Sequence, residues 1–187
     1  MRPVLVFDLL GTLLDVRSLD PVLLDGLVRR MMTATILDRY RPFEELAEET
    51  FGDGIGERLR ALPAYPDVLP SLERLERAGY AMHVLTNGGL ADARAQLANA
   101  GIARFFRGVH SAESCERYKP DVRVYRTTLV RIDTQPHEAV MLSAHAWDLA
   151  GAQHHGMQTA LVRRPGDGLA DVSETLVFFP VTAGLSA

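Results

Sequence analysis

The chain has 187 residues, of which 47% are hydrophobic and 24% charged, a composition typical of a folded globular domain. A formal net charge of −4 and a pI near 5.9 argue against nucleic acid or an anionic membrane surface as the main partner. The single cysteine, Cys115, excludes an internal disulfide, and no segment approaches the roughly 20 apolar residues of a membrane span. We therefore expect a cytoplasmic protein without membrane or nucleic-acid partners.

Short apolar segments alternate with segments of helical periodicity along most of the chain. The first, "VLVF" at residues 4–7, predicts a strand buried on both faces. The same pattern recurs at residues 81–86, 139–143, 159–162 and 175–179. Apolar residues at helical spacing predict helices at 68–78, 90–100 and 122–132. This alternation predicts an α/β protein with a Rossmann-like parallel sheet.

Residues 17–66 interrupt this alternation, because helix follows helix where one helix and then a strand are expected. Helices are predicted at 21–40 and 43–51, followed by a flexible break, "GDGIG", at 52–56 and a proline-rich return at 62–67. We interpret 17–66 as a small inserted helical cap and residues 1–16 and 67–187 as the core domain. The alternative is that these helices simply cover the sheet.

Polar side chains follow the predicted strands at the ends where ligands bind in doubly wound sheets. They are Asp8 and Thr12, then Thr86 and Asn87, then Ser143, His145 and Asp148; Lys119 precedes a helix in "YKPDVRVY". Each residue also has a purely structural interpretation, such as a turn for Thr86–Gly88 or a helix N-cap for Asp148. Their convergence from four segments favours a functional site.

Four segments resemble, in order, the four motifs of the haloacid dehalogenase superfamily. They are "VFDLLGTLLD", "LTNGG", "YKPDVRVY" and "LSAHAWDLAGA". The resemblance implies a core of that type and Asp8 as a covalent nucleophile. Phosphatases of the superfamily carry an acid two residues after the nucleophile and paired acids in the fourth motif that hold Mg²⁺. Here these positions are Leu10 and Ala144, which disfavours phosphoryl transfer.

With Leu10 and Ala144 at these positions, the chain resembles the L-2-haloacid dehalogenase branch of the superfamily, which needs no metal or other cofactor. The resemblance implies that Asp8 displaces halide from a short 2-haloalkanoic acid, and that hydrolysis of the ester gives a 2-hydroxy acid. The expected pocket residues are Leu10, Thr86, Asn87 and Tyr125, with Asn87 facing the halide. Thr12, Thr86 and Lys119 are expected to donate to the substrate carboxylate. Asp148, Ser143 and His145 are expected to position Lys119 and the hydrolytic water.

The predicted cap departs from this branch. An arginine that contacts the leaving halide is expected on its first helix, and the corresponding position is Leu24. Arg29 and Arg30 are the candidates to replace it. Two alternatives therefore stay open: a binding protein with a relic site, and a Mg²⁺-dependent phosphatase. Two further expectations, a preference for (S) substrates and a homodimer, rest on the resemblance alone.

Overall fold

The computed structural model describes residues 2–164. Its strands are β1 (Val4–Phe7), β2 (Met82–Thr86), β3 (Gly108–Ser111), β4 (Ala139–Ser143) and β5 (Gln158–Leu161). Its α-helices are α1 (Pro21–Ile36), α2 (Phe43–Phe51), α3 (Ile55–Arg60), α4 (Val68–Arg77), α5 (Leu90–Asn99), α6 (Val122–Arg131) and α7 (Ala146–His154). Three short 3-10 helices are η1 (Ala103–Phe105), η2 (Ala112–Cys115) and η3 (Pro136–Glu138). No helix within this part of the chain has the length and apolar character needed to cross a membrane.

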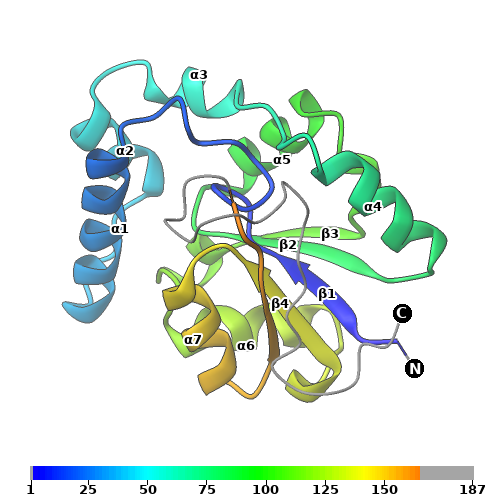
Figure 1. Ribbon diagram of the computed structural model, residues 1–187. Helices are drawn as coiled ribbons and strands as arrows, with labels where there is room; N and C mark the ends of the chain where they lie inside the picture. The colour runs from blue at the N-terminus through cyan, green and yellow to red at the C-terminus, as the bar shows by residue number, and fades with distance from the viewer. Residues whose placement is uncertain (1, 165–187) are drawn as a thin grey trace.

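The five strands form one parallel sheet in the order β3-β2-β1-β4-β5, with β1 at its centre (Figure 1). Successive residues of a strand face opposite sides, so Leu5 and Phe7 pack with residues of α4 and α5, while Val6 packs with residues of α6 and α7. Both faces are covered, which explains why the central strands are apolar without alternation. The predicted Rossmann-like α/β fold is confirmed.

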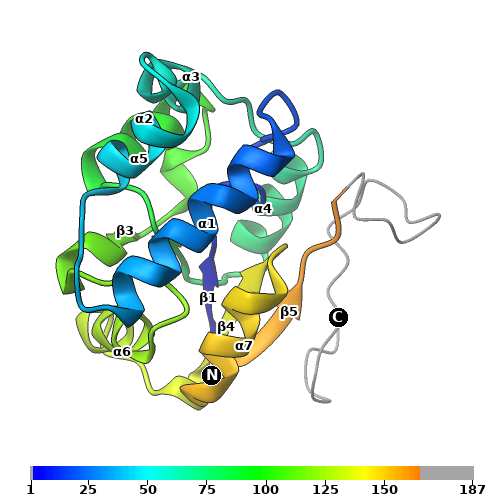
Figure 2. The same ribbon diagram turned by 90° about the vertical axis from the view of Figure 1, so that its left-hand side faces the viewer.

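Helices α1 and α2 lie beyond the carboxyl ends of the central strands, and Figure 2 shows α1 in front of the end of β1. Helix α1 begins at Pro21, and the preceding Asp20 carboxylate accepts hydrogen bonds from the Val22 and Leu23 amides. It packs on α2, which packs on α3, and α3 packs on α5. The sequence between β1 and α4 is therefore placed over the edge where the motif residues end.

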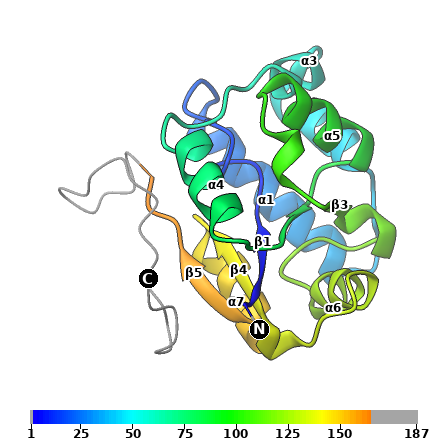
Figure 3. The same ribbon diagram turned by 90° about the vertical axis from the view of Figure 1, so that its right-hand side faces the viewer.

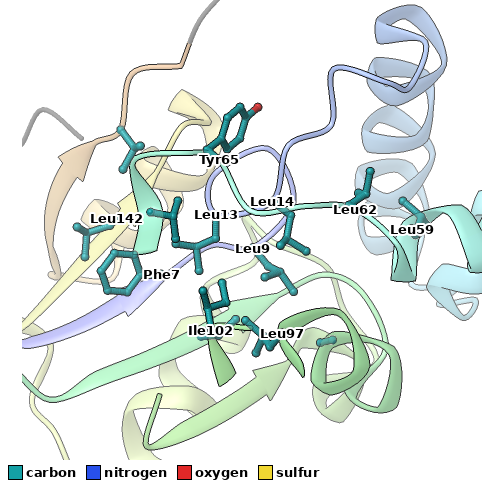
Figure 4. Packing of buried hydrophobic residues seen from close by; sticks show 14 of the residues in the cluster. Phe7, Leu9, Leu13, Leu14, Leu59, Leu62, Tyr65, Leu97, Ile102 and Leu142 are labelled. Atoms are coloured by element: carbon teal, nitrogen blue, oxygen red, sulfur yellow. The ribbon is translucent and has the colours of Figure 1, made fainter. Parts of the chain in front are cut away.

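The two chain segments that join these helices to the core are paired with each other. The Asp15 amide donates to the Pro63 carbonyl at 2.8 Å, and the Tyr65 amide donates to the Leu13 carbonyl at 3.0 Å. Figure 4 shows Leu13 and Leu14, from the loop after β1, close to Leu62 and Tyr65 of the return segment. This shared apolar packing fixes the helices relative to the loop that follows Asp8.

Several boundaries differ from the sequence prediction. Strand β3 was not predicted, because Val109 is its only apolar residue; Figure 3 shows it beside α5 at the edge of the sheet. Helix α1 ends at Ile36 rather than at residue 40, and Asp38 beyond it has a left-handed φ of 56°. The predicted break at 52–56 is wrong in its second half, because α3 begins at Ile55. The predicted strand at 175–179 lies outside the described residues.

Candidate active site

A cavity of about 510 Å³ lies between the carboxyl ends of the central strands and helices α1 and α2. Its polar lining at the sheet comes from Asp8, Thr86, Asn87 and His145. The remaining lining residues are Leu10, Val16, Leu24, Asp25, Leu27, Val28, Arg29, Met31, Met32, Phe43, Phe51, Leu59, Gly88 and Trp147. The predicted strand-end residues and the helices of 17–66 thus enclose one space.

The Asp8 carboxylate is at the sheet end of this cavity and is 4% exposed. Its Oδ1 accepts a hydrogen bond from Lys119 Nζ at 2.7 Å, and its Oδ2 accepts one from Thr12 Oγ1 at 2.7 Å. Burial raises the pKa of Asp8. The charges of Lys119 and His145, together with these hydrogen bonds, lower it by a larger amount, so the net shift of the pKa is downward. Asp8 is therefore ionised at neutral pH and faces the cavity.

Lys119 is fully buried and is the only lysine in the sequence. Its Nζ donates to Asp8 Oδ1 at 2.7 Å, to Asp148 Oδ2 at 2.8 Å and to the Leu85 carbonyl at 3.1 Å. Burial lowers the pKa of Lys119, but the two carboxylates raise it more. All three ammonium hydrogens have protein acceptors, so the expected bond from Lys119 to a substrate carboxylate is not supported.

Asp148 lies in the first turn of α7 and is completely buried. Its Oδ1 accepts a hydrogen bond from Tyr125 Oη at 2.7 Å, and its Oδ2 binds Lys119. Burial raises the pKa of Asp148, and the Lys119 charge only partly opposes this. Tyr125 was expected to bind substrate; in this structure it is not among the cavity-lining residues, and its hydroxyl donates to Asp148.

His145 precedes α7 and brings its ring to the cavity. Its Nε2 lies 2.9 Å from the Leu10 carbonyl and 3.6 Å from Asp8 Oδ2. Because a carbonyl only accepts hydrogen bonds, Nε2 carries a hydrogen in this arrangement. The ring stacks on Trp147, with centroids 5.3 Å apart and planes 14° apart, and the His145 amide donates to Ser143 Oγ at 3.1 Å. Ser143 is fully buried and therefore positions His145 without reaching the cavity.

Gly11 and Thr12 connect the first and fourth motifs. Gly11 has a φ of +79°, and a Cβ there would lie 3.1 Å from the His145 ring, so both conformation and space favour glycine. Thr12 Oγ1 accepts the Ala144 amide hydrogen at 2.9 Å while its own hydrogen goes to Asp8. Thr12 was expected to donate to the substrate carboxylate; instead its hydroxyl hydrogen is used by Asp8.

Thr86 and Asn87 keep donors that can face a ligand. Thr86 Oγ1 accepts the Gly88 amide hydrogen at 3.1 Å, which leaves its hydroxyl hydrogen available. Asn87 Oδ1 accepts the Lys119 amide hydrogen at 2.8 Å, which orients the side chain. Its Nδ2 has no acceptor among residues 2–164, and the residue lines the cavity.

No arginine of α1 has the place that the resemblance implies. Leu24 lines the cavity at that position. Arg29 also lines it but pairs with Asp25 one turn earlier on α1, at the exposed surface. Arg30 pairs with Glu49 of α2 at 3.0 Å and is absent from the lining.

Sequence analysis missed Arg164, which stabilises the loop behind Asp8. Its side chain is buried, donates through Nε to the Thr12 carbonyl at 2.9 Å and through Nη1 to Asp67 Oδ1 at 2.6 Å. The guanidinium also lies over the Tyr65 ring, 4.1 Å from its centroid. Two consecutive arginines after β5 carry no sequence signal that separates this residue from a surface arginine.

The residues present do not fit a divalent metal ion. Asp8 and Asp148, the two carboxylates beside Lys119, are both bound to its ammonium, and Ala144 supplies no third ligand. Within residues 2–164 no three acidic, histidine or cysteine side chains are grouped in a way that would hold a metal. The ammonium thus provides the positive charge between the carboxylates.

Comparison with known proteins agrees with this geometry. The family model for haloacid dehalogenase-like hydrolases matches residues 32–162. (S)-2-haloacid dehalogenase 4A of Burkholderia cepacia is 33% identical over 87% of this chain and 83% of its own length, and (S)-2-haloacid dehalogenase 1 of Pseudomonas sp. strain CBS-3 is 29% identical over 85% and 83%. A dehalogenase crystallised with an intermediate complex superposes with a TM-score of 0.81 and 28% identity, over 89% of this chain and 87% of that one. The chain belongs to the haloacid dehalogenase-like hydrolase family.

Proposed function

We propose that this protein is an (S)-2-haloacid dehalogenase, which converts a 2-haloalkanoate and water into a 2-hydroxy acid, halide and a proton. The observation that carries this proposal is the ionised Asp8 carboxylate, which faces an apolar cavity with Leu10 rather than an acid beside it. A departing halide needs no proton, so a site without a general acid suits it. The names of the relatives support the same reaction.

In the first step, one Asp8 oxygen attacks C2 of the substrate as the carbon–halogen bond breaks, and the halide leaves with the bonding electrons. The Thr86 hydroxyl binds the substrate carboxylate, and the Asn87 amide faces the halide. Lys119 does not touch the substrate. It keeps Asp8 ionised and oriented, while Asp148 and Tyr125 hold the ammonium in place.

In the second step, water adds to the ester carbonyl at Asp8 Cγ, and the bond from Cγ to the substrate oxygen breaks. This releases the 2-hydroxy acid, restores the Asp8 carboxylate and frees one proton. His145 orients the water, because its ring lines the cavity near Asp8. Since Nε2 donates to the Leu10 carbonyl, any proton transfer to this ring uses Nδ1.

We further propose that residues 17–66 act as a cap that excludes water from this chemistry. Helices α1 and α2 supply most of the apolar lining, and a dry cavity strengthens the interactions of a developing charge. The alternatives are less well supported. A phosphatase would need a metal site that Asp8, Lys119 and Asp148 do not provide, and a relic site has no reason to retain a buried three-residue charge network.

The test is halide release from (S)-2-chloropropionate and bromoacetate in the presence of EDTA. We expect release by the wild type and none by Asp8→Asn, while Asp25→Asn, which removes an exposed carboxylate of the same cavity, stays active. Multiple turnovers in oxygen-18 water should place the label in the Asp8 carboxylate. Label found only in the product would contradict an ester at Asp8, and no release by the wild type would contradict the proposed reaction.

A further inference from the structure

The cavity is larger than a short haloacid requires. Pockets that enclose drug-sized ligands measure about 300–1,000 Å³, and this cavity measures about 510 Å³, whereas 2-chloropropionate is much smaller than such a ligand. The space beyond Asp8 is lined by apolar side chains of the helices between residues 17 and 66. They are Leu24, Leu27, Val28, Met31, Met32, Phe43, Phe51 and Leu59.

This apolar part offers little to a second polar group of a ligand. Its charged residues are Asp25 and Arg29, which pair with each other and have side chains 64% and 69% exposed. Leu27, Met31, Phe43 and Leu59 are each at most 6% exposed, so the walls are held by the core. A ligand therefore gains affinity here by burying apolar surface rather than by pairing charge.

We propose that the substrates of this enzyme carry a long or bulky apolar group on C2, such as an alkyl chain of about four or more carbons or a phenyl ring. This inference rests on the proposed dehalogenase function and specifies its substrate class. The carboxylate and halide bind at the sheet end, and the apolar group extends between α1 and α2. The second part of the cavity is then filled by substrate rather than by water.

The first experiment measures bromide release along the series from 2-bromopropionate to 2-bromooctanoate, with 2-bromophenylacetate alongside. Burial of each added methylene raises kcat/KM by roughly 3- to 4-fold, so 2-bromohexanoate, with three more methylenes, should exceed 2-bromopropionate by about 30- to 60-fold. Val28→Phe fills the apolar part and should lower kcat/KM for 2-bromohexanoate by a larger factor than for 2-bromopropionate. Val22→Phe is the matched control, because Val22 is on the same helix, is 71% exposed and lies outside the lining.

A second experiment is independent of turnover: calorimetric titration of the wild type with propionate and octanoate, where octanoate should bind more tightly by at least about 30-fold. A series that is flat or falls with chain length would overturn the inference. If 2-bromopropionate is still hydrolysed in that case, the proposed function stands and only the substrate class is wrong. Failure of every bromoacid to release bromide would overturn both the proposed function and the substrate class. If Val28→Phe and Val22→Phe lower the activity equally, the loss comes from a disturbance of α1 and not from filling the cavity, which would also contradict the inference.

Discussion

Replacement of Lys119 by methionine removes the single positive charge between two buried carboxylates. Asp8 and Asp148 are 4% and 0% exposed, and each binds Nζ at 2.7 to 2.8 Å. Breaking a buried ion pair by removing one partner costs about 3–5 kcal/mol, because the remaining charge is uncompensated. We therefore expect Lys119→Met to lower the free energy of unfolding by about 3–5 kcal/mol at pH 7.5, or the melting temperature by about 10 °C.

The pH dependence separates this charge effect from a loss of packing. Without the ammonium, burial raises the pKa of both Asp8 and Asp148 above the values of the unfolded chain. The folded variant then binds protons in a range where the unfolded chain does not, so its stability rises as the pH falls toward the unfolded values. The difference between wild type and variant should accordingly shrink from pH 7.5 to pH 5.

Urea denaturation monitored by fluorescence measures both effects, since Trp147 is the only tryptophan and lies beside the site. Adding Asp148→Asn to Lys119→Met removes one of the two unpaired charges and should recover part of the lost stability. A loss below about 1 kcal/mol, or one that does not change with pH, would refute the view that Lys119 acts by compensating these carboxylates.

Three other substitutions test the surroundings of this network. Gly151→Ala would place a Cβ 2.7 Å from Tyr125 Oη and should lower the free energy of unfolding by about 1–3 kcal/mol, measured in a thermal melt. Gly26→Ala is the control, because nothing lies within 4 Å of its Cβ, and it should be neutral or stabilising. Equal effects of the two substitutions would contradict the packing argument. Tyr125→Phe removes the donor to Asp148 Oδ1 and should cost about 1–2 kcal/mol in urea denaturation and lower kcat more than it raises KM; an unchanged kcat would show that this bond is dispensable. Leu24→Arg adds a cation to the cavity lining and should raise kcat/KM for bromoacetate while lowering it for 2-bromohexanoate, and a parallel change in both substrates would count against a role in selectivity.

The sequence predicted the parts of the fold that depend on local pattern. Strands β1 and β4 are buried on both faces and have unbroken apolar runs, and β2 has one interrupted only by His83, so all three are easy to recognise. Parallel pairing then brings their carboxyl ends to one edge, which is why residues as distant as Asp8 and Asp148 could be predicted to meet. Edge strand β3 has three partly exposed residues out of four and gives no such signal.

Sequence pattern could not tell which partner takes each hydrogen bond. Lys119 was expected to bind substrate, but its distance from three protein acceptors is decided by tertiary packing. Tyr125 faces α7 from α6, and that direction depends on how two helices meet, with Gly151 leaving room for the Tyr125 hydroxyl. The size of the cavity likewise depends on where α1 lies relative to the sheet, which no periodicity in its sequence specifies.

The apolar residue two positions after Asp8 follows from the charge balance of the site. Asp8, Lys119 and Asp148 together carry one net negative charge. When the ester forms, this charge leaves with the halide, and Lys119 and Asp148 remain as a neutral ion pair. An acid in place of Leu10 would add a second negative charge that one ammonium cannot compensate at this depth. With Leu10 and Ala144 at these positions, the single Lys119 ammonium is enough to balance the carboxylates. The nucleophile, this ammonium and the apolar cavity form one consistent arrangement for displacing a halide from carbon.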